Sequence, residues 1–319
     1  MKLIQKATIE QVVHLLRVKN RIALFAHTNP DGDTIGASVA LRLALQKMGK
    51  AVSLFCDGDL SDSFSHFPQT KNISKTLEGE FDLYVAVDCG DVNRLGSFAG
   101  VYYKFPRSIT IDHHGGGYYS TYNYLADYAS CCQMVYEIIK ALEVRIDPEI
   151  ATYLYMGLST DTGNFAHSNT DADCFLMAAD LCKRGASTRL VYESFYCNRS
   201  IAETKLYGLV LSRLRIYHQG TMALLYVTKN DLESLSLDAT ATSGLVRFAI
   251  DIKNVKVGVC IVEHAENVYK VSMRGRYFDV RTICEHFGGG GHLFASGCII
   301  NGMFEDVVEK IVRVVDFYL

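Results

Sequence analysis

The sequence lacks three features, and each absence argues against one class of protein. Basic residues are not in excess, because 32 Lys and Arg stand against 35 Asp and Glu, giving a formal net charge of −3 at pH 7. No C-x-x-C pair occurs among the 10 cysteines, and no apolar run approaches the length of a membrane span. We therefore expect no broad basic surface for long nucleic acids, no disulfide framework and no membrane insertion.

The N-terminal segment does not resemble a signal peptide either. Residues 1–16 have helical spacing and contain Glu10, and they lack a long apolar core and a small-residue cleavage site. Several cysteines lie in apolar stretches, such as Cys260 within residues 257–262, which indicates buried, reduced thiols. The sequence predicts a cytoplasmic protein whose 319 residues form one large or two medium domains.

Strand and helix signals alternate through the first half of the chain. The alternation predicts an α/β domain with a largely parallel sheet flanked by helices. The strands are nearly continuous apolar runs, as expected where helices cover both faces of a sheet. We expect strands at residues 21–26, 51–55, 83–87 and 108–111, and helices at residues 34–48, 131–142, 148–158 and 171–183.

The second half predicts a smaller α+β domain. Helical signals over residues 189–214, with a polar interruption at 197–200, indicate that a helical linker joins the two domains. We expect the first domain to span residues 1–190 and the second to span residues 205–319. Strands are expected at residues 222–227, 256–263 and 269–273, and helices at residues 279–287 and 304–317.

Polar residues with metal-ligand chemistry follow the first predicted strand. His27, Asp31 and Asp33 form a His-x-x-x-Asp-x-Asp pattern where the chain passes into a helix. Open α/β sheets place their sites at such carboxyl ends of strands, and Gly32 is expected to permit a tight turn between the two carboxylates. The competing interpretation is that Asp33 or Thr34 only caps the helix. Capping would explain one oxygen but not His27 and Asp31.

Two further strands end in the same kind of residue. Asp88 follows residues 83–87 and could bridge two metal ions, although a simple loop aspartate is the better interpretation of Asp88 alone. Asp112-His113-His114 follows residues 108–111. The alternative for this triplet is a partly exposed turn before the glycines at 115–117. Charged and imidazole groups are rarely buried unless paired or metal-bound, which makes the turn the weaker interpretation.

Asp161 comes at the end of an apolar helix, where the helix dipole disfavours a negative charge unless a cation lies nearby. Gly163, a helix stop, is the alternative explanation of this segment. Four carboxylates and two imidazoles suit Mn²⁺ or Mg²⁺ better than structural zinc, which would bring cysteine. Two such ions, about 3.5–4 Å apart, would hold a hydroxide for in-line attack on phosphorus. The candidate ligands are His27, Asp31, Asp33, Asp88, His113 and Asp161.

The order of these motifs resembles the DHH phosphoesterase superfamily, which is named for the triplet found here at residues 112–114. The second half resembles the DHH-associated domain, whose Gly-Gly-Gly-His signature is matched by residues 288–292 and followed by Ala295-Ser296-Gly297. The resemblance covers nearly the whole chain. The pairing of the two domains is most similar to the oligoribonuclease (nanoRNase) and 3′-phosphoadenosine 5′-phosphate phosphatase group.

The resemblance implies roles for the individual residues. Asp88 and Asp161 would join His27 and Asp31 around one metal ion, and Asp33, Asp88 and His113, with Asp161 as a further candidate, would hold the other. Asp112 would orient an imidazole, and His114 would face the scissile phosphate. A substrate phosphate would be gripped by Arg274, Arg276, Gly289, Gly290, Gly291 and His292. The alternatives are a flexible glycine hairpin and solvated surface arginines, the latter applying most readily to Arg276.

Two positions depart from the family pattern. Gly115-Gly116-Gly117 is unusually glycine-rich, and Cys131-Cys132 stands where Ser or Thr is commoner. Neither position is a metal ligand, so both bear on substrate fit more than on catalysis.

The resemblance implies a two-metal phosphoesterase that uses Mn²⁺, with Mg²⁺ or Co²⁺ as alternatives. We expect it to cleave short RNA or dinucleotides to mononucleotides and 3′-phosphoadenosine 5′-phosphate to AMP, with no long nucleic acid and no membrane as partner; a homodimer is compatible with the catalytic domain. A cyclic or linear diadenylate phosphodiesterase is the main alternative. A family II pyrophosphatase, a RecJ-like exonuclease and a non-catalytic nucleotide-binding protein are weaker ones.

Overall fold

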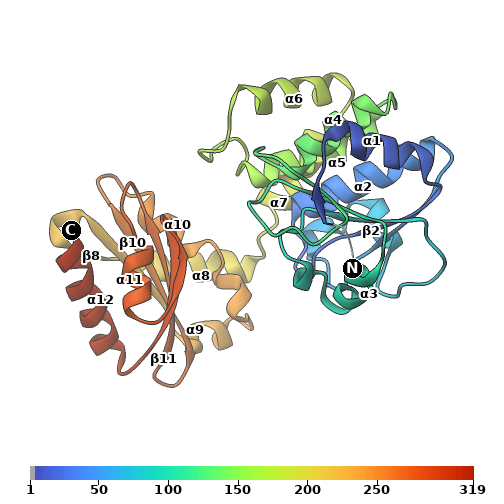
Figure 1. The fold of residues 1–319 in the computed structure, drawn as a ribbon. Coiled ribbons are helices and arrows are strands. Elements are labelled where there is room, and N and C mark those ends of the chain that lie inside the picture. Colours follow the sequence, from blue (N-terminus) through green and yellow to red (C-terminus); the bar gives the residue numbers. More distant parts are fainter. Residues whose placement is uncertain (1–3) are drawn as a thin grey trace. The chain divides into compact units, whose positions relative to one another are not determined.

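The computed structural model describes residues 4–319, which divide into two compact units: one extends to Asn198, and the other runs from Arg199 to Leu319. The predicted fold class is confirmed, with a large parallel sheet flanked by helices in the first unit and a smaller mixed sheet in the second (Figure 1). Within the described residues, no helix has the length and apolar character needed to cross a membrane.

The first unit is built on a seven-stranded sheet in the order β1-β7-β6-β5-β2-β3-β4, and every neighbouring pair is parallel. Its strands are β1 (Gln5–Lys6), β2 (Arg21–Phe25), β3 (Ala51–Phe55), β4 (Ile73–Ser74), β5 (Leu83–Val87), β6 (Ser108–Asp112) and β7 (Tyr122–Leu125). Its helices are α1 (Ile9–Val18), α2 (Gly32–Lys47), α3 (Ala99–Lys104), α4 (Cys131–Ala141), α5 (Pro148–Asp161), α6 (Ala172–Lys183) and α7 (Thr188–Tyr196).

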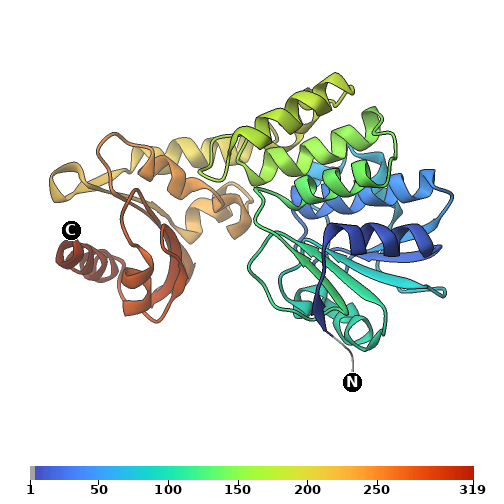
Figure 2. The same ribbon diagram turned by 45° about the horizontal axis from the view of Figure 1, so that its top comes forward.

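Both faces of this sheet are covered, which explains its apolar strands. Figure 2 shows helices on both sides of the sheet. Alternate residues of β2 contribute to two different cores: Ile22 and Leu24 pack with α1, α2, α4 and α5, and Ala23 and Phe25 pack on the α3 side. Helix α2 is buried along most of its length, because the sheet lies on one side of it and α4 and α5 lie on the other. The buried α2 is thereby fixed with its N-terminus at the carboxyl ends of the central strands.

Strand β7 was not predicted, because Tyr122-Asn123-Tyr124-Leu125 carries a polar residue in its centre. The structure buries Asn123 completely and satisfies its side chain. Its Oδ1 accepts hydrogen bonds from the backbone N–H groups of Tyr119 and Ser120, and its Nδ2 donates to the carbonyl of Ser120. A buried amide with partners on both atoms is compatible with a central strand, but the pairing is not visible in the sequence.

The second unit holds a six-stranded sheet in the order β12-β13-β11-β10-β9-β8, in which only β9 and β10 are parallel. One face packs against α11 and α12, and the other packs against α8 and α10. Its strands are β8 (Arg215–Tyr217), β9 (Met222–Val227), β10 (Val257–Ala265), β11 (Val268–Gly275), β12 (Gly290–His292) and β13 (Ala295–Asn301). Its helices are α8 (Ile201–Ser212), α9 (Lys229–Ser234), α10 (Leu245–Ile250), α11 (Arg281–His286) and α12 (Phe304–Tyr318).

Candidate metal centre

Strands β6, β5 and β2 are neighbours in the parallel sheet, and all three end at the same place. His113, Asp88 and His27 follow their carboxyl ends, while the start of α2 supplies Asp33 and the last residue of α5 is Asp161. The structure therefore brings all six predicted ligands together. Two groups of three divide the six, with ligand atoms within 4.8 Å of one another: His27, Asp31 and Asp88; and Asp33, His113 and Asp161. A third group of the same kind adds His114 to Asp88 and His113.

His113 directs one ring nitrogen at three carboxylates. Its Nδ1 lies 3.0 Å from the carbonyl oxygen of Tyr128, which assigns the ring proton to Nδ1 in the neutral form. Its Nε2 lies 3.8, 3.5 and 3.4 Å from carboxylate oxygens of Asp33, Asp88 and Asp161, respectively. Burial disfavours the charged ring, but these carboxylates outweigh burial and raise the pKa of His113 to about 10. The site thus attracts positive charge to the place where Nε2 points.

Three candidate ligands also lie around the hydroxyl of Thr34. Its Oγ1 lies 2.6 Å from Nε2 of His27, 2.6 Å from Oδ2 of Asp88 and 3.1 Å from Oδ1 of Asp31. A hydroxyl has a single proton, so it cannot donate to both carboxylates. Thr34 was considered only as a helix cap in the sequence, yet it is fully buried between three candidate ligands. The only signal for this role was its position directly after Asp33.

Asp33 is held by the N-terminus of α4. Its Oδ2 accepts a hydrogen bond from the backbone N–H of Cys131 at 2.5 Å, and its Oδ1 accepts from the backbone N–H of Cys132 at 2.9 Å. Burial, with the nearby Asp88 and Asp161, nevertheless raises the pKa of Asp33 well above its usual value. Cys131 and Cys132 thus serve the site through their backbone, which explains why residues other than Ser or Thr are accommodated.

The helix starts earlier than predicted, and this corrects the interpretation of two residues. Asp31, rather than Asp33 or Thr34, is the N-cap of α2: its Oδ1 accepts from the N–H groups of Asp33 and Thr34 at 3.1 and 3.0 Å. Gly32 is the first helical residue and does not form a tight turn. A Cβ atom at Gly32 would lie 2.9 Å from Cβ of Thr160 and closer still to its methyl group, so glycine is required by helix packing.

Within the Asp112-His113-His114 triplet, Asp112 contacts the second histidine. Its Oδ1 lies 2.8 Å from Nδ1 of His114, and Asp112 is completely buried. This hydrogen bond raises the pKa of His114 and fixes a ring whose side chain is 49% exposed. His113, by contrast, is oriented by the carbonyl of Tyr128. The triplet thus separates into a buried carboxylate, an inward imidazole and an outward imidazole.

The donor set fits a divalent cation. Nδ1 of His27, Oδ1 of Asp88 and Nε2 of His113 are buried and have no hydrogen-bond partner among the described residues. Burial, with Asp88 and Asp31, raises the pKa of Asp161 to about 6. Burial lowers the pKa of His27 and so favours the neutral imidazole that ligates metals. Unpaired buried acceptors are costly, and a cation would satisfy them together.

In the second unit, Arg274 lies on the face of the sheet that also carries Cys260 and Val262. Lys270, Ser272 and Arg274 alternate along β11 and line a hollow of about 360 Å³ that also includes Thr240 and Ser243. The guanidinium of Arg274 donates to the carbonyl of Met273 at 3.0 Å. Register across the sheet pairs Arg274 with Ala295, and Ala295 with His292. Residues paired in this way point to the same face, so Arg274 and His292 share it.

The glycine cluster is not a hairpin loop. Gly290, Gly291 and His292 form β12, an edge strand paired with β13. A Cβ atom at Gly289 would meet Cβ of Cys298 at 2.5 Å, so that glycine is required by close packing. Edge-strand amides, rather than loop amides, are therefore the donors available at this place. Arg276 lies apart from them, and its Nη2 donates to the carbonyl of Ile250 at 2.7 Å.

Two family models match the chain: the N-terminal domain of the DHH family over residues 21–158, and the DHHA1 domain over residues 220–319. The chain is 28% identical to the bifunctional oligoribonuclease and PAP phosphatase NrnA of Mycoplasma genitalium, over 97% of this chain and 98% of the relative.

Among solved structures, an exopolyphosphatase-related protein from Bacteroides fragilis has a TM-score of 0.86 at 24% identity, covering 97% of this chain and 96% of that one. Exonuclease RecJ bound to manganese has a TM-score of 0.53 at 13% identity, covering 100% of this chain and 97% of that chain. Both likenesses show the fold.

The chain carries the N-terminal domain of the DHH family followed by a DHHA1 domain, and it is a phosphoesterase of this two-domain type. The predicted family membership is confirmed. Its full-length relatives include bifunctional oligoribonucleases and PAP phosphatases.

Proposed function

We propose that this protein is a Mn²⁺-dependent phosphoesterase. It hydrolyses short oligoribonucleotides and dinucleotides to mononucleotides, and 3′-phosphoadenosine 5′-phosphate to AMP. The observation that carries the proposal is Nε2 of His113, which is buried, has no hydrogen-bond partner within residues 4–319 and lies 3.4–3.8 Å from three carboxylates. The names of the full-length relatives and the manganese bound by the RecJ structure support the substrate class and the ion.

His27, Asp31 and Asp88 are proposed to hold one ion, and Asp33, His113 and Asp161 the other, with Asp88 between the two groups. This assignment follows the geometric groups, in which Asp161 lies with Asp33 and His113. The ions supply an activated water and neutralise charge on the phosphoryl group. The protein fixes the ligands beforehand, through the N-terminus of α4 for Asp33 and the Tyr128 carbonyl for His113.

His114 is proposed to face the reacting phosphate. Asp112 holds its ring, and the raised pKa favours the protonated imidazole, which donates to a phosphate oxygen or to the leaving oxygen. In the second unit, Arg274 with His292 and the amides of Gly290 and Gly291 is proposed to bind a substrate phosphate. The N–H of Gly289 already donates to the carbonyl of Cys284 at 2.9 Å, and the guanidinium of Arg276 is bound to the carbonyl of Ile250, so neither is assigned to the phosphate. Cytoplasmic location and a homodimer stay predictions.

The test compares substrates on one protein preparation. Linear dinucleotide, five-residue RNA, 3′-phosphoadenosine 5′-phosphate, cyclic diadenylate and pyrophosphate are each incubated with Mn²⁺. Asp88→Asn is the informative variant: it keeps the side-chain volume, and Asn tolerates the left-handed backbone found at Asp88 (φ 56°). Asp173→Asn on α6 is the control. We expect the variant to be folded and inactive on dinucleotide; near-normal turnover would overturn the metal assignment, and cyclic diadenylate as the preferred substrate would overturn the substrate class.

A further inference from the structure

One surface hollow of the first unit adjoins the candidate metal centre and shares two residues with it, His113 and His114. It has a volume of about 360 Å³ and is lined by His113, His114, Gly115, Gly116, Tyr118, Leu125, Ala126 and Asp127. Ligand pockets begin at about this size, on the order of 300 Å³. Because His113 and His114 line both the hollow and the acidic cluster, a nucleotide whose phosphate lies at the cluster places its own base or sugar within reach of this hollow.

The Tyr118 ring is the aromatic side chain of the hollow. It is 49% exposed, and within residues 4–319 it stacks on no other ring and forms no side-chain hydrogen bond. Large aromatic rings normally gain most from burial, and tyrosine combines an apolar face with a polar tip. An exposed ring beside a candidate catalytic histidine is therefore a surface on which a flat ligand can stack.

The backbone on both sides of Tyr118 is fixed. The N–H of Gly117 donates to the carbonyl of Gly90 at 3.0 Å, and a Cβ atom at Gly116 would come within 2.6 Å of Cα of Gly90. On the other side, Tyr119 is buried and its hydroxyl donates to the carbonyl of Cys89 at 2.5 Å. Gly116, in the glycine run that departs from the family pattern, thus allows the chain to lie against the segment after Asp88, whereas Cβ atoms at Gly115 and Gly117 would meet nothing within 4 Å. These contacts fix the backbone that carries Tyr118 beside the site before any ligand binds.

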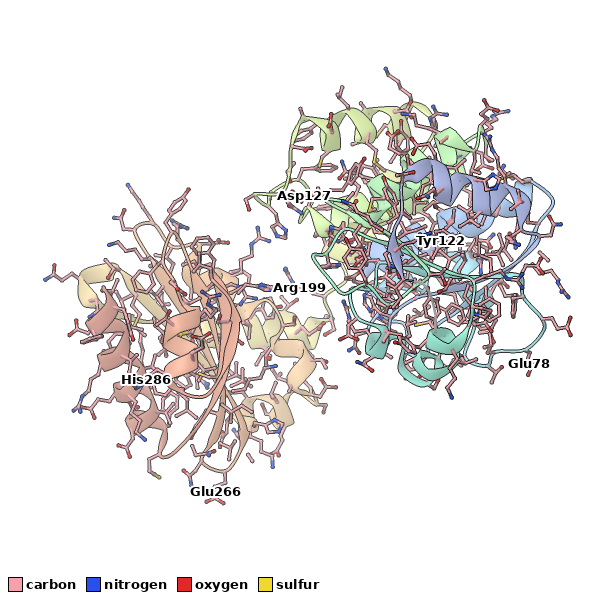
Figure 3. The ribbon with its side chains drawn as sticks, in the orientation of Figure 1. Glu78, Tyr122, Asp127, Arg199, Glu266 and His286 are labelled. Atoms are coloured by element: carbon pink, nitrogen blue, oxygen red, sulfur yellow. The ribbon has the colours of Figure 1, made fainter. Side chains whose placement is uncertain are left out.

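From this geometry we infer that Tyr118 is a stacking platform for a nucleobase of the substrate, within one nucleotide of the reacting phosphate. The inference rests on the proposed function and specifies its base subsite. Stacking on an aromatic ring tolerates every base, because each has a π-face. Asp127 lines the same hollow; its exposed side chain lies in the loop after β7 and is labelled in Figure 3. Its carboxylate accepts hydrogen bonds from an exocyclic amine and so favours bases that carry one.

The test distinguishes recognition of the base from recognition of the phosphate. The kcat/KM of wild type, Tyr118→Ala and Tyr118→Phe is measured on a dinucleotide and on the same dinucleotide with one base removed. Tyr103→Ala on α3 is the control, because Tyr103 is 50% exposed and is not among the residues lining the hollow. We expect Tyr118→Ala to lose about tenfold or more on the intact dinucleotide, the size of one base–aromatic stack. We expect little loss on the abasic substrate, and near wild-type rates for Tyr118→Phe.

Equal losses on both substrates, or none, would overturn the inference. A binding measurement at equilibrium tests the base subsite separately from the proposed catalytic function. Calorimetry compares binding of a nucleoside monophosphate with that of ribose 5-phosphate. If wild type cleaves no dinucleotide, the proposed function fails, yet a Tyr118→Ala loss confined to the nucleoside monophosphate still supports the subsite. Asp127→Asn should reduce the preference for guanine over uracil in the same measurement, and an unchanged preference would remove Asp127 from the subsite.

Discussion

Gly157 lies directly against Asp33. A Cβ atom placed at Gly157 would come within 2.5 Å of Oδ1 and 2.9 Å of Cα of Asp33, and it would also overlap the sulfur of Cys132. Helix α5 therefore approaches α2 and α4 closely enough to restrict the movement of the Asp33 carboxylate. The close packing of these helices therefore also fixes the position of a candidate metal ligand.

Gly157→Ala is expected to damage both stability and metal binding. The extra methyl group must displace the backbone of Asp33 or the thiol of Cys132, and overpacking of this kind costs about 1–3 kcal/mol. Denaturant unfolding of the metal-free protein measures the first effect, and Mn²⁺ titration measures the second. Gly208→Ala in α8 is the matched control, because nothing lies within 4 Å of its Cβ position. It should be neutral or stabilising by up to about 1 kcal/mol, and equal destabilisation in the two variants would contradict the account.

Thr34→Val is expected to weaken metal binding while preserving the shape of the core. Valine matches threonine in shape but removes the hydroxyl that lies 2.6 Å from both His27 and Asp88. Loss of a group that orients metal ligands typically costs about 10–100-fold in affinity. Calorimetric titration with Mn²⁺ measures the change, and Thr34→Ser should restore most of it. Unaltered affinity in the valine variant would show that the hydroxyl only fills space.

Mn²⁺ should stabilise the folded protein through the first unit. A ligand that binds only the native state at 100 times its Kd adds about 2.7 kcal/mol. The rise in Tm with Mn²⁺ should disappear in His113→Ala, because the imidazole whose Nε2 faces three carboxylates is lost. Chelation should return the wild type to its metal-free Tm. An equal rise in the variant would place the stabilising ion elsewhere.

The free energy of unfolding should depend on pH through Asp231 in the second unit. Asp231 is buried; burial raises its pKa, but the bidentate hydrogen bonds from Arg213, at 2.5 and 2.9 Å, outweigh burial and hold the pKa below its usual value. A depressed carboxyl pKa contributes stability that is present above the unfolded value, about 3.9, and is lost as pH falls through the folded value.

Asp231→Ala leaves Arg213 without its partner, and breaking such a pair costs about 3–5 kcal/mol when both groups are buried. Because Arg213 is 27% exposed, we expect the lower end of that range. Urea unfolding at pH 7 and at pH 3 should show a difference between wild type and variant that shrinks in acid. Asp231 also accepts a hydrogen bond from the N–H of Thr228, the N-cap of α9, at 2.8 Å. A difference independent of pH would assign the effect to the loss of this cap.

Arg274→Ala is expected to weaken the binding of substrates with a terminal phosphate more than it slows the cleavage of a small generic phosphodiester. The guanidinium lies on the same face as His292 and lines a polar hollow. Arg276→Ala is the matched control, since its guanidinium is bound to the carbonyl of Ile250. Steady-state kinetics on both substrates measure the difference. Equal losses on the two substrates would argue against a phosphate-binding role for Arg274.

The sequence alone predicted the parallel sheet, because its strands are continuous apolar runs that alternate with helical segments. It also predicted the ligand residues, since carboxylates and imidazoles stood at three strand ends, and parallel strands bring such ends to one edge. Roles that depend on contacts across the fold were not visible. Thr34 joins the site because the start of α2 packs against the ends of β2 and β5, and the backbone of Cys132 joins it because α2 and α4 pack beside each other.

Sequence periodicity also failed where tertiary pairing overrides local preference. Gly290 and Gly291 have no preference for a strand, yet β12 forms because β13 supplies the hydrogen bonds. Chemistry and fold class were therefore determined by the sequence through residue type and spacing. The start of α2 at Gly32, the hydrogen bond of Asp112 to His114 rather than to His113, and the placement of Tyr118 were decided only by the tertiary structure. Each depends on distances between segments far apart in the chain, and local spacing does not specify those distances.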